Sequence, residues 1–308
     1  MNDAHKTTVG VVIPTFNGGS LWKKVVEALQ RQSSDFDKIL IIDSGSTDDT
    51  VMIAQEAGFA VENIPSSEFN PGKTRNLGVQ KIDCDIVVFL TQDAIPMNNS
   101  ISLLTKSLNN EGTAVAYARQ LPHDDATPIA AHARLFNYKE EGYVYELKDR
   151  DKHGIRTCFS SDTFSAYNIK HFIAIGGFSN HIAGGEDMHI AAKALIAGYK
   201  VCYAAEATCK HSHNYTFKQE FKRYFDTGVV HHEEAWIRET FGKLKNEGFK
   251  FIQSEFFFLW KQKKFAWIPI TFINNFLKIL GYKLGQNHKK LPRKLAANFS
   301  AYKAYWKQ

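Results

Sequence analysis

Cysteine is scarce in this chain, and its pattern argues against two kinds of cysteine-based framework. The sequence has 308 residues and four cysteines, at Cys84, Cys158, Cys202 and Cys209. No two of them form a CxxC pair, and their spacing is uneven. Zinc sites need closely spaced thiolates, and disulfide scaffolds need many cysteines in a short chain. We therefore expect neither framework, and a reducing cytosolic setting is the default.

The chain also lacks an uninterrupted apolar run long enough to cross a bilayer. The first residues, from Met1 to Lys6, are polar, so we expect no signal peptide. Residues 265–284 have the length of a membrane span. That segment is interrupted by Pro269, Asn274, Asn275, Lys278 and Lys283. Because polar residues are costly in hydrocarbon, we expect this helical segment and the aromatic one at 249–264 to lie in a membrane interface. An ordinary helical subdomain packed on the sheet is the alternative.

Acidic residues are almost absent from the C-terminal part of the chain. From Lys243 to the end there are 14 Lys and Arg but only 2 Glu, whereas the rest of the chain has 24 basic and 30 acidic residues. This asymmetry predicts a catalytic body, residues 1–215, followed by a basic, aromatic-rich helical region, residues 216–308, that meets an anionic surface. The basic residues lie on aromatic helices and form no recognisable nucleic-acid motif, so we expect a membrane rather than nucleic acid.

Strands and helices alternate in the first third of the chain. We expect strands at 9–14, 39–43, 60–64 and 86–90, with helices at 20–32, at 46–57 and from 74 onward between them. Further strands are predicted at 113–119, 163–169 and 201–205, and a helix at 188–197. This alternation is typical of an α/β fold with an open, mostly parallel sheet.

The fourth expected strand ends in an acidic tip. The buried run Ile86–Leu90 is followed by Thr91, Gln92 and Asp93. Ligands of α/β sheets bind at the carboxyl ends of the strands, where one carboxylate can hold a divalent cation against a phosphorylated substrate. The alternative is that Asp93 only caps the following turn.

The first two strands end in polar turns that should lie side by side. The first turn contains Pro14, Thr15 and Asn17, and the second begins with Asp43 and Ser44. The Asp43 carboxylate can accept a hydrogen bond from a pyrimidine ring N–H, and the small residues allow a nucleoside to approach closely. The following acids, at 48 and 49, are more often helix-start residues than ligands.

These motifs together resemble family 2 glycosyltransferases, which have the nucleotide-sugar-binding GT-A fold. The resemblance is carried by P-T-F-N at 14–17, by D-S-G-S-T-D-D-T at 43–50 and by the acidic tip at Asp93, and it covers roughly residues 7–215. It implies that Asp43 contacts the base and that Asp93 matches the second, metal-ligating acid of the usual Asp-x-Asp motif. Thr91 stands where the first acid would be.

Two shorter motifs are similar to the rhamnosyltransferase branch, which uses dTDP-L-rhamnose. They are T-Q-D-A at 91–94 and F-N-P-G-K-T-R-N at 69–76. The branch commonly has His-Gly-Gly at 71–73, so this chain departs from it there. Arg75 is expected to reach the donor phosphates or nucleoside, the alternative being a surface salt bridge. The residues expected to bind the donor are Pro14, Thr15, Asn17, Asp43, Ser44, Arg75, Asn76, Thr91, Gln92 and Arg223.

The sequence Gly184-Gly185-Glu186-Asp187 precedes an expected helix and resembles the acidic pair of the family. The resemblance implies that Asp187 is the base, with Glu186 positioning or binding the acceptor. Inverting transfer needs one carboxylate to take the acceptor hydroxyl proton, while the leaving diphosphate needs only charge neutralisation. The alternative is two helix-start acids placed favourably in the helix dipole.

A histidine pair follows the last expected strand, and the resemblance implies that a histidine here completes the metal shell or contacts the diphosphate. Residues i and i+2 of an extended segment face opposite ways, so we expect only one of His211 and His213 to reach the cation, with a preference for His213. The cation would be Mg²⁺ or Mn²⁺.

Further on, Arg223 lies in a segment that weakly resembles the Q-x-x-R-W motif of processive synthases. The spacing is one residue too long, and Tyr224 stands in place of Trp. We therefore expect a non-processive enzyme.

The sequence therefore predicts a glycosyltransferase bound peripherally to the cytoplasmic face of the inner membrane. It would move L-rhamnose from dTDP-β-L-rhamnose, with inversion, to a lipid-linked saccharide of a surface polysaccharide such as O-antigen, capsule or cell-wall glycan. The alternatives are a UDP-hexose or UDP-N-acetylhexosamine transferase of the same fold, a nucleotidyltransferase, a non-catalytic membrane-bound scaffold and a nucleic-acid binder. The acceptor, the linkage and the oligomeric state are left open.

Overall fold

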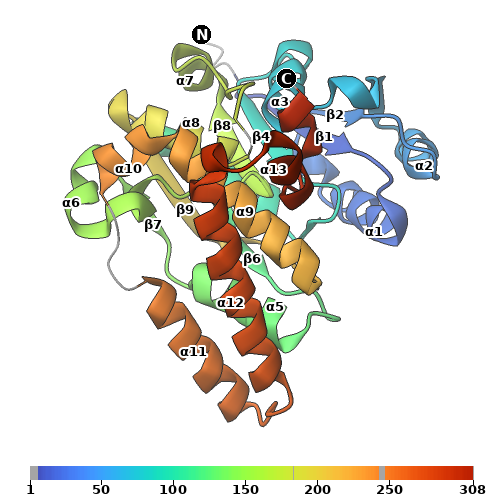
Figure 1. Ribbon diagram of the computed structural model, residues 1–308. Helices are drawn as coiled ribbons and strands as arrows, with labels where there is room; N and C mark the ends of the chain where they lie inside the picture. Colours follow the sequence, from blue (N-terminus) through green and yellow to red (C-terminus); the bar gives the residue numbers. More distant parts are fainter. Residues whose placement is uncertain (1–5, 183, 243–246, 308) are drawn as a thin grey trace.

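The computed structural model describes residues 6–182, 184–242 and 247–307 as one α/β body with a helical extension (Figure 1). The strands are β1 (Val9–Thr15), β2 (Lys38–Asp43), β3 (Ala60–Asn63), β4 (Ile86–Leu90), β5 (Ile95–Pro96), β6 (Thr113–Leu121), β7 (Tyr143–Tyr145), β8 (Phe164–Asn168) and β9 (Lys200–Lys210). The helices are α1 (Gly19–Gln30), α2 (Thr50–Glu56), α3 (Pro71–Lys81), α4 (Ser100–Lys106), α5 (Pro128–Asn137), α6 (Arg150–His153), α7 (Ile169–Ala174), α8 (Glu186–Ile196), α9 (Phe217–Glu233), α10 (Ala235–Phe241), α11 (Glu247–Lys261), α12 (Trp267–Gln286) and α13 (Arg293–Phe299).

The strands form one mixed sheet in the order β3-β2-β1-β4-β8-β6-β9-β5, with β7 paired to β9. The four strands β3, β2, β1 and β4 are parallel, as the sequence predicts. The prediction of a mostly parallel sheet is confirmed, since β6 and β9 also pair in parallel. The exceptions are β8, which runs antiparallel to both β4 and β6, and the short strands β5 and β7, which run antiparallel to β9. Since β1, β2 and β4 run in one direction, their carboxyl ends meet at one edge, where Thr15 pairs with Asp43.

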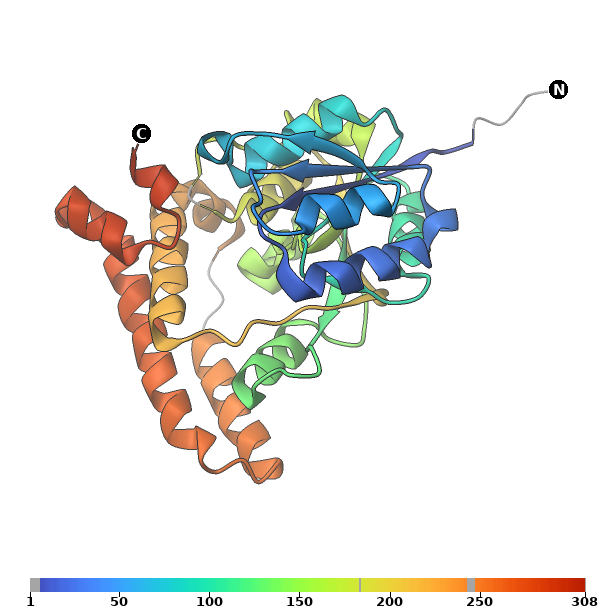
Figure 2. The same cartoon turned by 90° about the vertical axis from the view of Figure 1, so that its right-hand side faces the viewer.

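Side-chain alternation along the strands builds a core on each face of the sheet. Val11 and Ile13 of β1 face a cluster that includes Trp22 of α1, whereas Val12 faces the opposite cluster, with Phe89 and α8. The first cluster is covered by α1, α2 and α4, which lie together in Figure 2. Fully burying an aliphatic side chain of this size contributes about 1.5–3 kcal/mol. This two-faced core fixes the strand ends that carry the polar tips.

The C-terminal helices pack against each other through glycines. A Cβ atom added at Gly285 of α12 would lie 2.0 Å from the carbonyl oxygen of Phe225 in α9, and one added at Gly281 would lie 2.5 Å from that of Phe221. Only glycine permits so close an approach of two helix backbones. The pairing of 221 with 281 and of 225 with 285 makes α9 and α12 run parallel, so the seam fixes their register.

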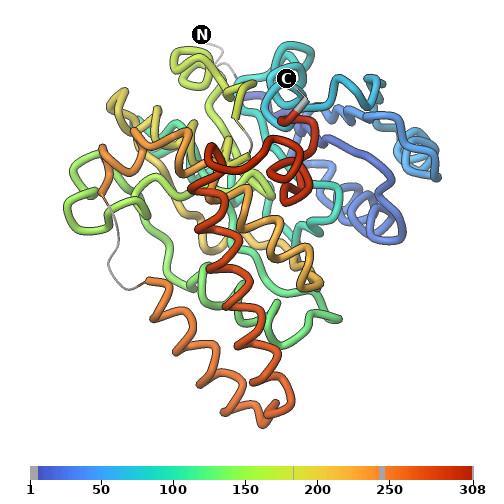
Figure 3. Tube along the Cα trace, viewed as in Figure 1, coloured from blue at the N-terminus to red at the C-terminus, as the bar shows by residue number. Residues whose placement is uncertain are grey.

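The helices α11 and α12 form a hairpin that extends away from the sheet, whereas the last residues return toward α3 (Figure 3). The return is tied by the Asn70 amide, which donates to the Tyr302 hydroxyl at 3.1 Å. Within the described ranges, no helix combines the length and the apolar character needed to cross a membrane. The hairpin keeps a strongly apolar outer surface, including Phe249, Phe257 and Phe276, each more than half exposed.

Candidate active site

The Asp43 carboxylate lies buried at the end of β2 and organises the turn that follows it. One of its oxygens accepts from the hydroxyls of Thr15 (2.9 Å) and Ser46 (2.5 Å). The other accepts from the backbone N–H groups of Gly45 and Ser46, at 2.9 and 2.8 Å. These bonds occupy the roughly four acceptor positions of a carboxylate. A base N–H would have to replace one of these donors to reach Asp43.

Other residues expected at the donor tie the strand ends together. The Gln92 side-chain oxygen accepts from the backbone N–H of Phe16 at 2.7 Å, and its amide nitrogen donates to the Phe16 carbonyl at 3.0 Å. The Ser44 hydroxyl donates to the Thr15 carbonyl at 2.9 Å. Asn17, in the left-handed region at φ 47°, accepts from the backbone N–H of Thr47. These bonds give this edge of the sheet a fixed shape.

Pro14 and Thr91 lie at the same edge of the sheet. Pro14 pairs with Ile42 of β2. Thr91 directly follows β4, and its backbone N–H donates to the Thr163 carbonyl at 3.0 Å. Both residues therefore have their backbones fixed by neighbouring strands or loops.

Asp93, His211 and His213 converge on one point. The Nε2 atom of His211 lies 3.6 Å from Oδ1 of Asp93, and Nε2 of His213 lies 3.7 Å from Oδ2. One ligand atom from each of the three residues lies within 4.8 Å of the others. Two imidazole nitrogens and a carboxylate oxygen are a donor set that suits Mn²⁺ and other transition ions.

The expectation that only one histidine reaches this point is wrong. It rests on strand alternation, but β9 ends at Lys210, and the residues after it are not in a strand. Outside the strand the two side chains no longer point to opposite faces, and the rings of His211 and His213 pack edge to face with their centres 4.5 Å apart. Both histidines are therefore candidate ligands.

A buried glutamine at the end of β6 orients His211. Gln120 accepts from Nδ1 of His211 at 2.9 Å, and its oxygen also accepts from Nη1 of Arg134 at 2.5 Å. Its amide nitrogen donates to the Ser161 hydroxyl at 2.9 Å. With the proton on Nδ1, the Nε2 lone pair of His211 is directed toward Asp93, as in metal sites with a supporting hydrogen bond.

The electrostatics of the cluster suit a cation. Burial alone would raise the pKa of Asp93, but the neighbouring imidazoles of His211 and His213, which attract the carboxylate whenever they are protonated, lower it well below its ordinary value. Burial lowers the pKa of His213 to about 4, with a further contribution from His211. The carboxylate is therefore charged and the His213 imidazole neutral near pH 7, which is the state in which both bind metals.

Glu186 and Asp187 begin α8, where Gly184 and Gly185 adopt positive φ values of 133° and 71°. Burial, followed by the nearby charges of Asp162 and Glu186, raises the pKa of Asp187 to about 8. A carboxyl group with a pKa near the working pH is suited to accept a proton in catalysis. The raised pKa is therefore compatible with a general base at Asp187, which stays a prediction.

Arg75 and Asn76 lie beside the acidic pair and the loop that precedes it. The Arg75 guanidinium is buried and pairs with Glu186 at 2.9 Å, with Asp162 4.0 Å from its Nε atom. The alternative of a surface salt bridge is therefore wrong, whereas contact between Arg75 and the donor stays a prediction. Asn76 exchanges hydrogen bonds with the backbone of Phe178 and so holds the loop before α8. Both residues position the acidic pair.

Arg223, in the first part of α9, lies near His213. Its guanidinium pairs with Glu220 at 3.2 Å and lies over the ring of Tyr215, 5.2 Å from the ring centre. His213 and Arg223 line one cavity, so Arg223 lies on the same cavity as one member of the cation cluster formed by Asp93, His211 and His213.

The sequence reading missed Gln120, Arg134 and Asp162. Gln120 lies near the carboxyl end of a buried strand, 113–121. A polar residue in that position is the same signal that indicates Asp93. Asp162 precedes β8, which runs the other way, and its burial beside Arg75 depends on contacts across the sheet.

Comparisons with known proteins agree with this geometry. Residues 10–176 match the family model described as glycosyl transferase family 2. The chain is 46% identical to the O-antigen chain rhamnosyltransferase RfbN of Salmonella typhimurium, over 97% of this chain and 96% of that protein. It is also 46% identical to the O-antigen chain rhamnosyltransferase WbaN of Salmonella anatum, over 96% and 95% of the two chains.

Solved structures show the same fold. The mannosyltransferase PcManGT from Pyrobaculum calidifontis, solved in complex with GDP-Man and Mn²⁺, aligns with a TM-score of 0.58 at 17% identity, over 98% of this chain and 78% of that one. The S. aureus TarS fragment 1–349 aligns with a TM-score of 0.53 at 14% identity, over 92% and 91%. The GT-A prediction is confirmed, and the chain belongs to glycosyl transferase family 2 and is a glycosyltransferase.

Proposed function

We propose that this glycosyltransferase transfers L-rhamnose from dTDP-β-L-rhamnose, with inversion, to a lipid-linked saccharide during O-antigen synthesis. The observation that carries the proposal is the 46% identity to two O-antigen chain rhamnosyltransferases over nearly the whole of each chain. The motifs at 69–76 and 91–94 support the same donor class. The non-catalytic scaffold is disfavoured, because Asp93, His211 and His213 converge as a candidate metal site and Asp187 has a raised pKa suited to a base.

The residues have complementary roles in this reaction. Asp187 takes the proton of the acceptor hydroxyl as that oxygen bonds to the anomeric carbon and the bond from this carbon to the diphosphate oxygen breaks. Arg75 holds Glu186 beside Asp187 through the 2.9 Å ion pair. A divalent cation held by Asp93, His211 and His213 would neutralise the charge of the departing nucleoside diphosphate. Arg223, on the same cavity as His213, supplies a further cation for phosphate oxygens of the donor or of the acceptor.

We also propose that the enzyme binds peripherally to the cytoplasmic face of the inner membrane through the α11–α12 hairpin. The apolar side chains that its surface exposes most are Phe249, Phe257, Trp260, Phe272 and Phe276. Lysines at the turn between the two helices, Lys261, Lys263 and Lys264, are exposed beside them. Aromatic insertion combined with lysines that attract anionic headgroups is the pattern of an interfacial helix pair.

A donor screen by calorimetry tests the catalytic part of the proposal. The purified protein is titrated with dTDP-L-rhamnose, UDP-glucose, UDP-N-acetylglucosamine and free dTDP, each with and without Mn²⁺. Binding that requires Mn²⁺ and is selective for dTDP-L-rhamnose is expected. Selectivity for a UDP-sugar would overturn the rhamnose assignment and leave the base assignment intact. Binding of none of them would favour the scaffold.

A further inference from the structure

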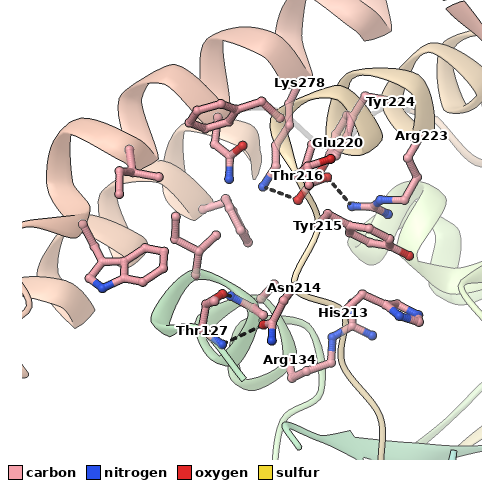
Figure 4. Close-up of a pocket in the computed structure, with 18 of the residues that line it drawn as sticks. Thr127, Arg134, His213, Asn214, Tyr215, Thr216, Glu220, Arg223, Tyr224 and Lys278 are labelled. Atoms are coloured by element: carbon pink, nitrogen blue, oxygen red, sulfur yellow. Dashed lines mark hydrogen bonds and ion pairs between the residues drawn. The ribbon is translucent and has the colours of Figure 1, made fainter. Parts of the chain in front are cut away.

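A cavity of about 430 Å³ lies between the sheet body and the hairpin (Figure 4). Its wall is built by α5, by residues 213–217, by the first turns of α9, by Phe251 of α11 and by α12. The volume is in the range of small-molecule sites, about 300–1,000 Å³. It therefore has room for a polar group larger than a few water molecules.

The cavity is positively charged. Arg134, Arg223 and Lys278 line it from three different helices, with Glu220 as its single acidic lining residue among those described. Figure 4 shows Arg223 and Lys278 both directed at Glu220, at 3.2 and 3.6 Å. In the described part of the chain, no carboxylate lies within ion-pair distance of Arg134, whose Nη1 contacts the neutral Gln120 amide. Among the lining side chains, three cations against one carboxylate leave an excess of two positive charges. Behind this lining, Lys278 also faces Glu255, a carboxyl group whose pKa is raised by burial, which favours its neutral form.

The two ends of the cavity differ in chemistry. One end contains His213 and so adjoins the cation cluster with Asp93. The other is lined by Trp267 and Ile270 of α12, the helix whose outer surface exposes Phe272 and Phe276. A ligand that fills the cavity would have an anionic group near the reaction centre and an apolar part along α12.

We propose that this cavity binds the diphosphate group of the lipid-linked acceptor, with the lipid leaving along α12 toward the membrane. The proposal rests on the proposed function, because it places that reaction's acceptor. A diphosphate esterified on both sides carries two negative charges, which match the excess of two positive charges in the cavity. A single phosphodiester headgroup carries only one. Lys278, buried on α12, is the cation that belongs to the hairpin side of the site.

Vesicle flotation of the full chain tests the assignment. The probes are phosphatidylcholine vesicles containing either a polyprenyl diphosphate or phosphatidylglycerol at matched charge. Lys278→Gln should weaken binding to the diphosphate vesicles about tenfold, the loss of one charge-assisted contact. Lys283→Gln is the matched control, because it removes the same charge from an exposed position of α12 outside the cavity. The phosphatidylglycerol vesicles should not distinguish the two variants.

A second measurement uses the unaltered protein, so it does not depend on how a variant folds. Inorganic pyrophosphate should release the protein from diphosphate vesicles and leave it on phosphatidylglycerol vesicles. Equal behaviour of the two variants, or no effect of pyrophosphate, would overturn the proposal. Weaker nucleotide-sugar binding by Lys278→Gln would also overturn it, because the cavity would then belong to the donor. A failed donor screen combined with diphosphate-specific flotation would overturn the proposed donor and leave this site standing.

Discussion

The glycine seam between α9 and α12 makes a sharp prediction about stability. In Gly285→Ala, the new Cβ atom would lie 2.0 Å from the Phe225 carbonyl oxygen, whereas ordinary contact begins at 3.4 Å. The two helices must therefore move apart by about 1.4 Å at this point. A gap of 0.5–1 Å already removes roughly a quarter to a half of the dispersion energy of a contact, so most of the attraction between the helices near this point is lost.

The size of the effect follows from two opposing terms. Overpacking of this kind costs about 1–3 kcal/mol, and a clash with backbone puts the cost at the upper end. Replacing a helical glycine by alanine returns about 1 kcal/mol. The net loss is then about 2 kcal/mol, which corresponds to a Tm lower by about 3 °C for a chain of this length, because the unfolding entropy is roughly 2.1 cal/mol/K per residue.

Thermal unfolding followed by circular dichroism measures this loss. The control is Gly248→Ala in α11, where an added Cβ meets nothing within 4 Å, so Tm should stay unchanged or rise slightly. If Gly285→Ala melts within a degree of Gly248→Ala, the helices do not pack as closely as described. Vesicle flotation of Gly285→Ala and Gly248→Ala separately compares their membrane binding, and so shows whether the position of the hairpin affects it.

The remaining predictions concern the active site. Asp187→Asn should abolish transfer while calorimetry still detects donor binding; near-normal turnover would exclude Asp187 as the base. Because the pKa of Asp187 is raised to about 8 and the base is the deprotonated form, kcat/KM should rise with pH and level off above about 8, and a flat profile between pH 6 and 9 would contradict this assignment. His211→Ala and His213→Ala should each weaken Mn²⁺ binding measured by calorimetry, whereas the one-ligand alternative predicts loss in only one of them. Gln120→Leu should weaken Mn²⁺ binding about 10–100-fold through the lost hydrogen bond to His211, and unchanged affinity would show that this bond does not orient the ligand.

Much of the donor-side architecture could be predicted from the sequence, because it depends on local patterns. The buried run Ile86–Leu90 forms β4 with the same limits as expected, and the strands before it lie within a residue or two of their predicted bounds. Strand direction in the first half follows from the helices between the strands. The reversal at β8 could not be predicted in this way, because its two neighbours, β4 and β6, are distant in the sequence.

The roles of individual residues divide in the same way. The sequence by itself determined the family, the strand tips and the acidic residues Asp93 and Asp187, because each follows from residues adjacent in the chain. Only the tertiary structure decided that both histidines face Asp93, that Gln120 orients one of them and that Arg75 is buried under Glu186. These arrangements join residues about 90–120 positions apart, and no local periodicity encodes such distances. They arise where the residues that follow β4 and β9 meet the end of β6, and where α3 packs against the start of α8.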